Sequence, residues 1–130
     1  MLGCAKFQTA RECGSFVSAI QTWKSQAPRP AASGSPLPSP SAAAVESRSL
    51  ADRYDELAKR IDALGLTSAQ LLPHAQSYQK LSREAAAALR DVAEAVEKGD
   101  AARARQRRIE FDDLARGEAP LVAEINRVCR

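Results

Sequence analysis

Prolines divide this chain into two segments that can be helical and one that cannot. Five of the seven prolines lie between Pro28 and Pro40, in a stretch rich in Ser, Ala and Gly. Proline lacks a backbone N–H and clashes with the preceding helical turn, so no helix can run through such a cluster. The sequence therefore predicts a Pro/Ser/Ala-rich linker over residues 25–44, with proline-poor stretches on either side.

The composition favours helices packed around a thin core. Alanine supplies about a fifth of the residues, and Leu, Ile, Val and Phe together supply about another fifth. Alanine is the best helix former, and its small side chain lets helices approach closely. A chain of 130 residues suits one domain. The predicted fold class is therefore all-α: an up-down-up-down four-helix bundle with long third and fourth helices.

The first helix of the bundle is predicted over residues 9–24, after an N-terminal tether over residues 1–8. Thr9 and Glu12 have the spacing of a capping box, in which each side chain bonds the other residue's backbone N–H. Apolar residues then recur on one helical face, namely Cys13, Phe16, Val17 and Ile20.

Residues 45–130 are predicted to form the three-helix core of the same domain. Gly65 is a typical helix terminator, and Thr67 with Gln70 forms a second capping box that predicts the start of the third helix. The turn at Gly99 then separates the third and fourth helices. Short loops place neighbouring helices antiparallel. In the fourth helix, Gly117 and Pro120 predict a kink or a short break.

Counting residues outward from the two turns predicts which side chains face each other. From Gly65, Tyr54 is expected opposite Tyr78, and from Gly99, Tyr78 is expected near Leu121. The simplest interpretation is that these side chains belong to the core. The alternative is a small apolar ligand pocket lined by Tyr54, Tyr78 and Leu121, since helical bundles host ligands between their helices.

The far end of the third and fourth helices is predicted to have too few packing partners. These two helices span about 30 residues each, against about 20 for the second and about 15 for the first. The exposed end carries apolar residues beside a basic patch: Val92, Val96, Arg103, Arg105, Arg107 and Arg108. Arginines in the first turns of a helix oppose its dipole, so helix stability does not explain them. We interpret the set as an interaction surface for a protein partner or an anionic surface; the alternative is a solvated face covered in part by the linker.

Three cysteines in a small chain leave one unpaired when a disulfide forms. Cys13 begins the first helix and Cys129 ends the last, so the predicted bundle brings both to the same pole. A Cys13–Cys129 disulfide is the favoured interpretation and would add about 4–5 kcal/mol in the chain-entropy model. Two alternatives stay open: three reduced cytosolic thiols, or a zinc site that uses His74 without any CxxC spacing.

The sequence carries no motif for catalysis. It has neither HExxH nor a glycine-rich phosphate loop, and His74 lacks a Ser or Cys partner at triad spacing. A net charge of +3 with no recognised motif argues against direct nucleic-acid binding. No apolar run approaches the length of a membrane span. We therefore expect a protein that is not an enzyme, needs no cofactor or metal, and acts through an unknown protein partner.

The first four residues, Met1-Leu2-Gly3-Cys4, resemble a lipobox, the end of a bacterial lipoprotein signal peptide. The whole chain resembles the small helical lipoproteins of unknown function found in bacterial envelopes. This resemblance implies that Cys4 is lipidated and that the lipid is the only membrane contact, on the periplasmic face of the envelope. The rest of the signal peptide would then lie upstream of Met1. If Met1 is instead the true start, the protein is a cytoplasmic helical adaptor with free thiols.

Overall fold

All regular secondary structure in the described part of the chain is helical, as the sequence predicts. The computed structural model describes residues 2–26 and 39–130. Five helices follow one another along these residues: α1 (Leu2–Ser25), α2 (Pro40–Ala63), α3 (Leu72–Glu97), α4 (Ala101–Arg116) and α5 (Glu118–Val128).

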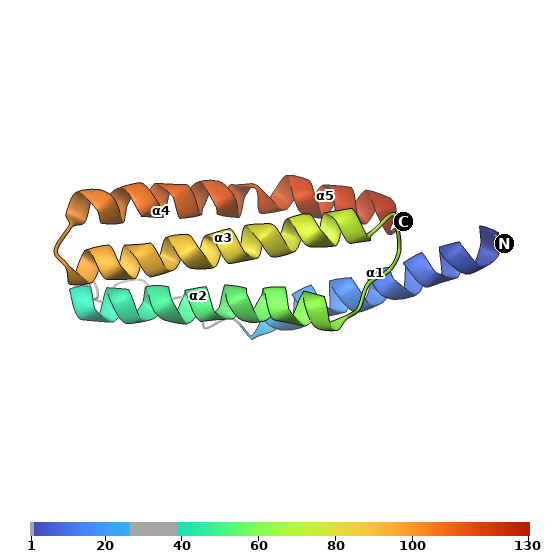
Figure 1. The fold of residues 1–130 in the computed structure, drawn as a ribbon, viewed down its shortest axis with the longest axis horizontal. Helices are drawn as coiled ribbons and strands as arrows, with labels where there is room; N and C mark the ends of the chain where they lie inside the picture. The colour runs from blue at the N-terminus through green and yellow to red at the C-terminus, as the bar shows by residue number, and fades with distance from the viewer. Residues whose placement is uncertain (1, 27–38) are drawn as a thin grey trace.

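The helices run up, down, up and down, with α4 and α5 together forming the fourth rod (Figure 1). The predicted break falls at Gly117, whose N–H bonds back to the carbonyls of Asp113 and Leu114. The third helix ends as predicted too, because Gly99 adopts a left-handed φ of 72°. Asp100 then caps α4 by accepting the Arg103 N–H at 3.1 Å. The predicted all-α bundle is confirmed.

The first helix is longer than the sequence predicts. It begins at Leu2 instead of Thr9, so the tether predicted over residues 1–8 is helical from Leu2 onward. Thr9 and Glu12 therefore lie inside α1 and do not cap it. Their side chains contact the loop between α2 and α3 instead. The prediction failed because the same Thr and Glu side chains can bond a neighbouring loop as well as their own helix end.

The second helix also starts earlier than predicted. Residues 27–38 of the predicted linker lie outside the described part of the chain, but its last residues, 40–44, belong to α2. Ser39 is the N-cap, and its hydroxyl accepts the Ala42 N–H at 3.2 Å. Pro40 occupies the first helical position, where a missing N–H costs nothing. The helix therefore gains a full turn at its N-terminus.

The turn between α2 and α3 is longer than the second capping box predicts. Gly65 adopts the expected left-handed φ of 60°, but α3 begins only at Leu72 and no side chain caps it. Residues 65–71 form a loop, and its length changes which residues of α2 lie opposite which residues of α3. Two ion pairs show the register of these helices: Arg83 lies 3.1 Å from Asp62, and Arg90 lies 2.6 Å from Asp55. Tyr54 therefore does not face Tyr78 as predicted.

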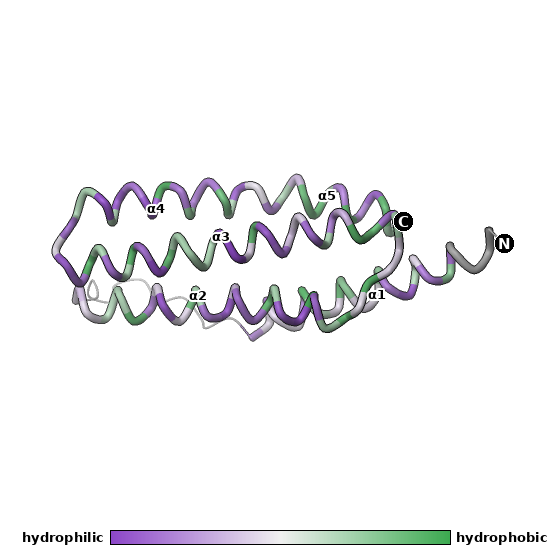
Figure 2. Tube along the Cα trace, in the orientation of Figure 1, coloured by the Kyte–Doolittle hydropathy of each residue, from purple (hydrophilic) through white to green (hydrophobic). Residues whose placement is uncertain are grey.

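The core has two clusters, placed in turn along the bundle. The cluster near the chain termini is rich in large side chains and includes Phe16, Trp23, Leu57 and Tyr78. The second cluster, toward the α3–α4 turn, is built mainly from alanines with Leu89 and Phe111. In Figure 2, hydrophobic and hydrophilic segments alternate along each helix, as amphipathic packing requires. Small side chains in the second cluster allow close helix contact.

The far end of α3 lies against α2, which was predicted to be too short to reach it, although α1 ends before this point (Figure 1). Arg48, near the start of α2, pairs with Glu97, the last residue of α3. Because α2 runs along the whole of α3, Val92 is buried with 7% exposure, and Val96 is half-buried. The extra turn of α2 and the longer loop explain the difference. In the apolar half of the predicted interaction surface, Val92 is therefore core and Val96 is half-buried.

Two phenylalanines on α1 provide a matched test of this packing. Phe16 is fully buried, whereas Phe7 is 79% exposed. We expect Phe16→Ala to lower the free energy of unfolding by about 3–5 kcal/mol, the usual cost of removing a buried aromatic ring. Phe7→Ala should change it by less than about 0.5 kcal/mol. Urea unfolding followed by circular dichroism measures both, and equal effects would contradict the placement of α1.

Candidate functional site

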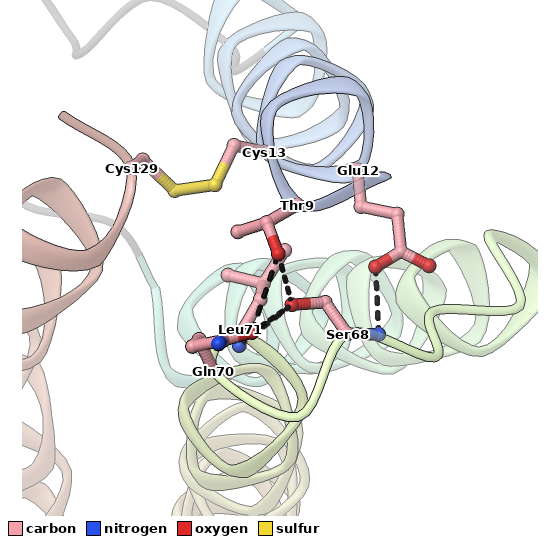
Figure 3. Close-up of a disulfide and its surroundings, with 7 residues drawn as sticks. All are labelled: Thr9, Glu12, Cys13, Ser68, Gln70, Leu71 and Cys129. Atoms are coloured by element: carbon pink, nitrogen blue, oxygen red, sulfur yellow. Dashed lines mark hydrogen bonds between the residues drawn. A yellow bond between two sulfur atoms is a disulfide. The ribbon is translucent and has the colours of Figure 1, made fainter. Parts of the chain in front are cut away.

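The most distinctive site lies at the pole where α1, α5 and the α2–α3 loop meet. There the structure joins Cys13 of α1 to Cys129 at the end of α5 by a disulfide, with Cα atoms 5.7 Å apart (Figure 3). The predicted pairing is thus present, and the alternatives of reduced thiols or a zinc site at these two cysteines do not describe this structure. The disulfide links the first and last helices of the chain.

A polar cluster beside the disulfide fixes α1 to the α2–α3 loop. The Glu12 carboxylate accepts the backbone N–H groups of Thr67 and Ser68, each at 2.7 Å, and the Thr67 hydroxyl at 3.0 Å. The hydroxyls of Thr9 and Ser68 are 2.8 Å apart (Figure 3). Desolvation acts to raise the pKa of the Glu12 carboxyl, but the bonds from Thr67 and Ser68 outweigh it and the pKa is lowered. The carboxylate therefore stays charged and bound.

Sequence reasoning identified these residues but assigned them the wrong partners. Thr9 with Glu12 and Thr67 with Gln70 were each predicted to cap their own helix. Instead, the two sets bond each other across the pole, where Thr9 also reaches Gln70 at 3.3 Å. The signal for this exchange was the presence of two capping boxes at the same predicted pole.

The C-terminal end of α1 is fixed to α2 by reciprocal hydrogen bonds. The Trp23 indole N–H donates to the Arg53 carbonyl at 2.7 Å. The Arg53 guanidinium donates to the carbonyls of Trp23 at 2.7 Å and Gln26 at 3.0 Å, and it lies 5.0 Å from the Trp23 ring. A cation at the C-terminus of a helix stabilises it. These contacts end α1 about halfway along the bundle (Figure 1).

A third contact connects α1, α3 and α5. The buried Tyr78 hydroxyl donates to the Glu118 carboxylate at 2.6 Å, and Lys24 lies 3.0 Å from the same oxygen. Burial first, and then this hydrogen bond, raise the pKa of the Tyr78 hydroxyl far above its usual value. Tyr78 therefore stays protonated and serves as a donor within the core.

Tyr54, Tyr78 and Leu121, the side chains of the alternative ligand pocket, pack into the core, as the simplest interpretation expects. Tyr78 packs edge-on against Phe16, with ring centroids 6.0 Å apart. Tyr54 packs instead against Trp23 at 5.1 Å and Phe111 at 5.9 Å. Leu121 shares the cluster of Tyr78, as counting from Gly99 predicts. The two tyrosines thus belong to neighbouring parts of the core, and neither borders the groove described next.

A surface groove of about 550 Å³ lies between α3 and α4. Its lining combines small or apolar side chains with charged ones: Leu81, Glu84, Ala87, Ala88, Arg107, Glu110, Asp113, Leu114 and Gly117. Each acidic residue of the lining is within 4 Å of a basic side chain of this chain. The carboxylates that line the groove are therefore all paired with cations of this chain.

The four predicted arginines do not act as one patch. Arg107 lies 2.6 Å from Asp91 and pairs with Glu110, so it holds α4 against α3. Arg103, Arg105 and Arg108 are exposed, and Arg108 lies over the Phe111 ring at 5.5 Å. Next to them, Ile109 is 60% exposed, which sequence reasoning missed. The exposed basic surface is therefore the outer face of α4 around Ile109.

The described residues contain neither a metal-binding cluster nor a membrane-spanning helix. No group of three or more His, Cys, Asp or Glu side chains there is arranged to hold a metal ion. Among the described helices, none has both the length and the hydropathy needed to cross a bilayer. Comparison with protein-family models, curated proteins and solved structures finds no match for this chain.

Removing the disulfide should weaken the whole bundle. We expect Cys13→Ser/Cys129→Ser to lower the free energy of unfolding by about 2–5 kcal/mol, because the open chain gains entropy when it unfolds. Urea unfolding without reductant measures this, and Cys4→Ser is the control with an intact pair. Dithiothreitol should lower the stability of the native sequence but leave the double variant unchanged. A native sequence insensitive to reductant would contradict the pairing.

Proposed function

We propose that this protein is a non-enzymatic helical module of the bacterial cell envelope, anchored through acylated Cys4 and acting through protein contacts. The disulfide between Cys13 and Cys129 is the observation that carries the proposal. Disulfides persist in oxidising compartments and are rare in the cytosol. The pairing of Cys13 with Cys129 leaves Cys4 as the third cysteine, within the lipobox-like Met1-Leu2-Gly3-Cys4.

The two ends of the bundle suit different tasks under this proposal. Cys4 lies in α1, which projects at the pole of the disulfide, and the α3–α4 turn lies at the opposite end (Figure 1). The 26 residues of α3 separate the two ends by about 39 Å at 1.5 Å per residue. An anchor at Cys4 therefore leaves the N-terminal part of α4 far from the membrane.

The outer face of α4 is the proposed contact surface. Exposed Arg105 and Arg108 flank exposed Ile109. Cations around one apolar side chain fit an acidic protein surface with an apolar pocket. Arg107 is left out because it is half-buried and holds α4 to Asp91 of α3, whereas Arg108 pairs only along its own helix, with Asp112 at 3.5 Å.

Acylation of Cys4 is the decisive test of the anchor. Expression from the gene with its upstream codons should yield membrane-associated protein whose N-terminal peptide carries a diacylglyceryl group on Cys4. Cys4→Ala should move the protein to the soluble fraction, with the bundle intact. Mass spectrometry and fractionation measure both. Unmodified Cys4 together with reduced Cys13 and Cys129 would contradict the proposal and favour the cytoplasmic adaptor.

Charge reversal on α4 tests the contact surface. A photocrosslinking amino acid at Ile109 should form adducts with one partner in living cells. Adding Arg105→Glu/Arg108→Glu should reduce the adduct by more than tenfold, because like charges across an interface repel. The matched control is Lys59→Glu/Lys80→Glu, which makes the same charge change on exposed positions of α2 and α3. Equal adduct yields in both variants would contradict this surface.

A further inference from the structure

We propose that the projecting N-terminal part of α1, centred on Phe7, lies against an anionic lipid surface and sets the orientation of the bundle on the membrane. This inference rests on the proposed anchor at Cys4 and adds a second membrane contact to it. The partner is the headgroup layer of the bilayer that holds the lipid, and the contact residues are Lys6, Phe7 and Arg11.

Helix α1 extends past the rest of the bundle at this pole (Figure 1). Among the side chains of α1 that the structure describes, from Lys6 onward, the first to bond the α2–α3 loop is that of Gln8, which contacts Thr67, followed by Thr9 and Glu12. Phe7 precedes all of these contacts and is 79% exposed, the highest value among the exposed large apolar residues of the described chain. Phenylalanine is usually buried, and at this exposure the Phe7 ring is free to enter an apolar layer.

The charges around Phe7 are basic on its exposed side. Lys6 and Arg11 are both exposed, and Arg11 lies four residues after Phe7, on the same face of α1. The acidic neighbour, Glu12, is bound by the backbone of Thr67 and Ser68 on the side that faces the loop.

Helix α5 contributes mainly paired or basic groups to the same pole. Glu124 lies 2.7 Å from Arg127, and the terminal Arg130 is exposed. The Glu124 carboxylate of α5 is therefore already paired and does not compete for the cations around Phe7.

An anionic bilayer fits this face better than a protein does. One aromatic ring with two cations offers too little apolar area for a stable protein interface. Aromatic rings are favoured at the membrane–water interface, and Lys and Arg close to it bind anionic headgroups. Cys4 lies three residues before Phe7 in α1, about one helical turn. Acyl chains on Cys4 would therefore hold the bilayer next to Phe7.

Such a contact would orient the whole bundle because α1 is held firmly. The disulfide at Cys13 and the bonds of Glu12 fix α1 to α5 and to the α2–α3 loop. Acyl chains alone tether a protein but leave it able to tilt. Contact at Phe7, Lys6 and Arg11 would add a second point of attachment and restrict that tilt.

The test supplies the tether chemically, so it does not depend on acylation in cells. The Cys4 thiol is coupled to a maleimide lipid in vesicles of phosphatidylcholine and phosphatidylglycerol, with the Cys13–Cys129 disulfide intact. In the Phe7→Trp variant, lipids brominated near the headgroup should quench the new indole. The native protein is the control, because its single tryptophan, Trp23, lies 16 residues farther along α1, about 24 Å away. Its fluorescence should not change.

Charge reversal separates the lipid contact from simple proximity to the tether. Each cation near an anionic surface shifts the bound population by about fivefold, so Lys6→Glu/Arg11→Glu should remove most of the quenching of the Phe7→Trp indole. Lys59→Glu/Lys80→Glu should not. High salt or pure phosphatidylcholine should also reduce the quenching.

Three results would overturn the inference. These are no quenching on anionic vesicles, equal quenching on neutral vesicles, and photocrosslinking from position 7 in cells to a protein instead of lipid. None of them bears on acylation of Cys4, which the mass of the mature peptide decides separately. The anchor and the orienting contact can therefore fail independently.

Discussion

The bundle is held together by the burial of α3 among all the other helices. Its small side chains, including Ala85, Ala86 and Ala88, are buried with almost no exposure. They allow α2 and α4 to pack closely on either side, while Tyr78 at the other end receives Phe16 of α1 and bonds Glu118 of α5. Because α3 contacts every partner, its register decides where each surface residue of the protein lies.

Features that depend on chain direction alone could be predicted from the sequence. The turn at Gly99, the break at Gly117 and the meeting of Cys13 with Cys129 follow from helix boundaries and antiparallel order. Register could not be predicted, because residues 65–71 form a loop where a capping box suggested a helix start. Tyr54 was therefore assigned the wrong facing residue on α3, although it packs against the cluster of Tyr78, and the length of α2 was underestimated.

Polar residues were the hardest to place from sequence. A carboxylate such as Glu12 satisfies backbone N–H groups equally well at its own helix end or on a neighbouring loop, and only the tertiary fold decides which. The arginines of α4 show the same limit. Arg107 finds Asp91 across the helix pair, whereas Arg105 remains on the exposed face. The closeness of these arginines in the sequence does not indicate which of them form ion pairs with α3 and which stay exposed.

The span of the disulfide has a consequence for the fate of damaged protein. Its cysteines are 116 residues apart, so the bond closes nearly the entire chain into a ring. A protease that cuts once anywhere between Cys13 and Cys129 produces two fragments that stay covalently joined. Neither fragment is therefore released by that single cleavage. Loss of either fragment then requires a second cut or reduction of the bond.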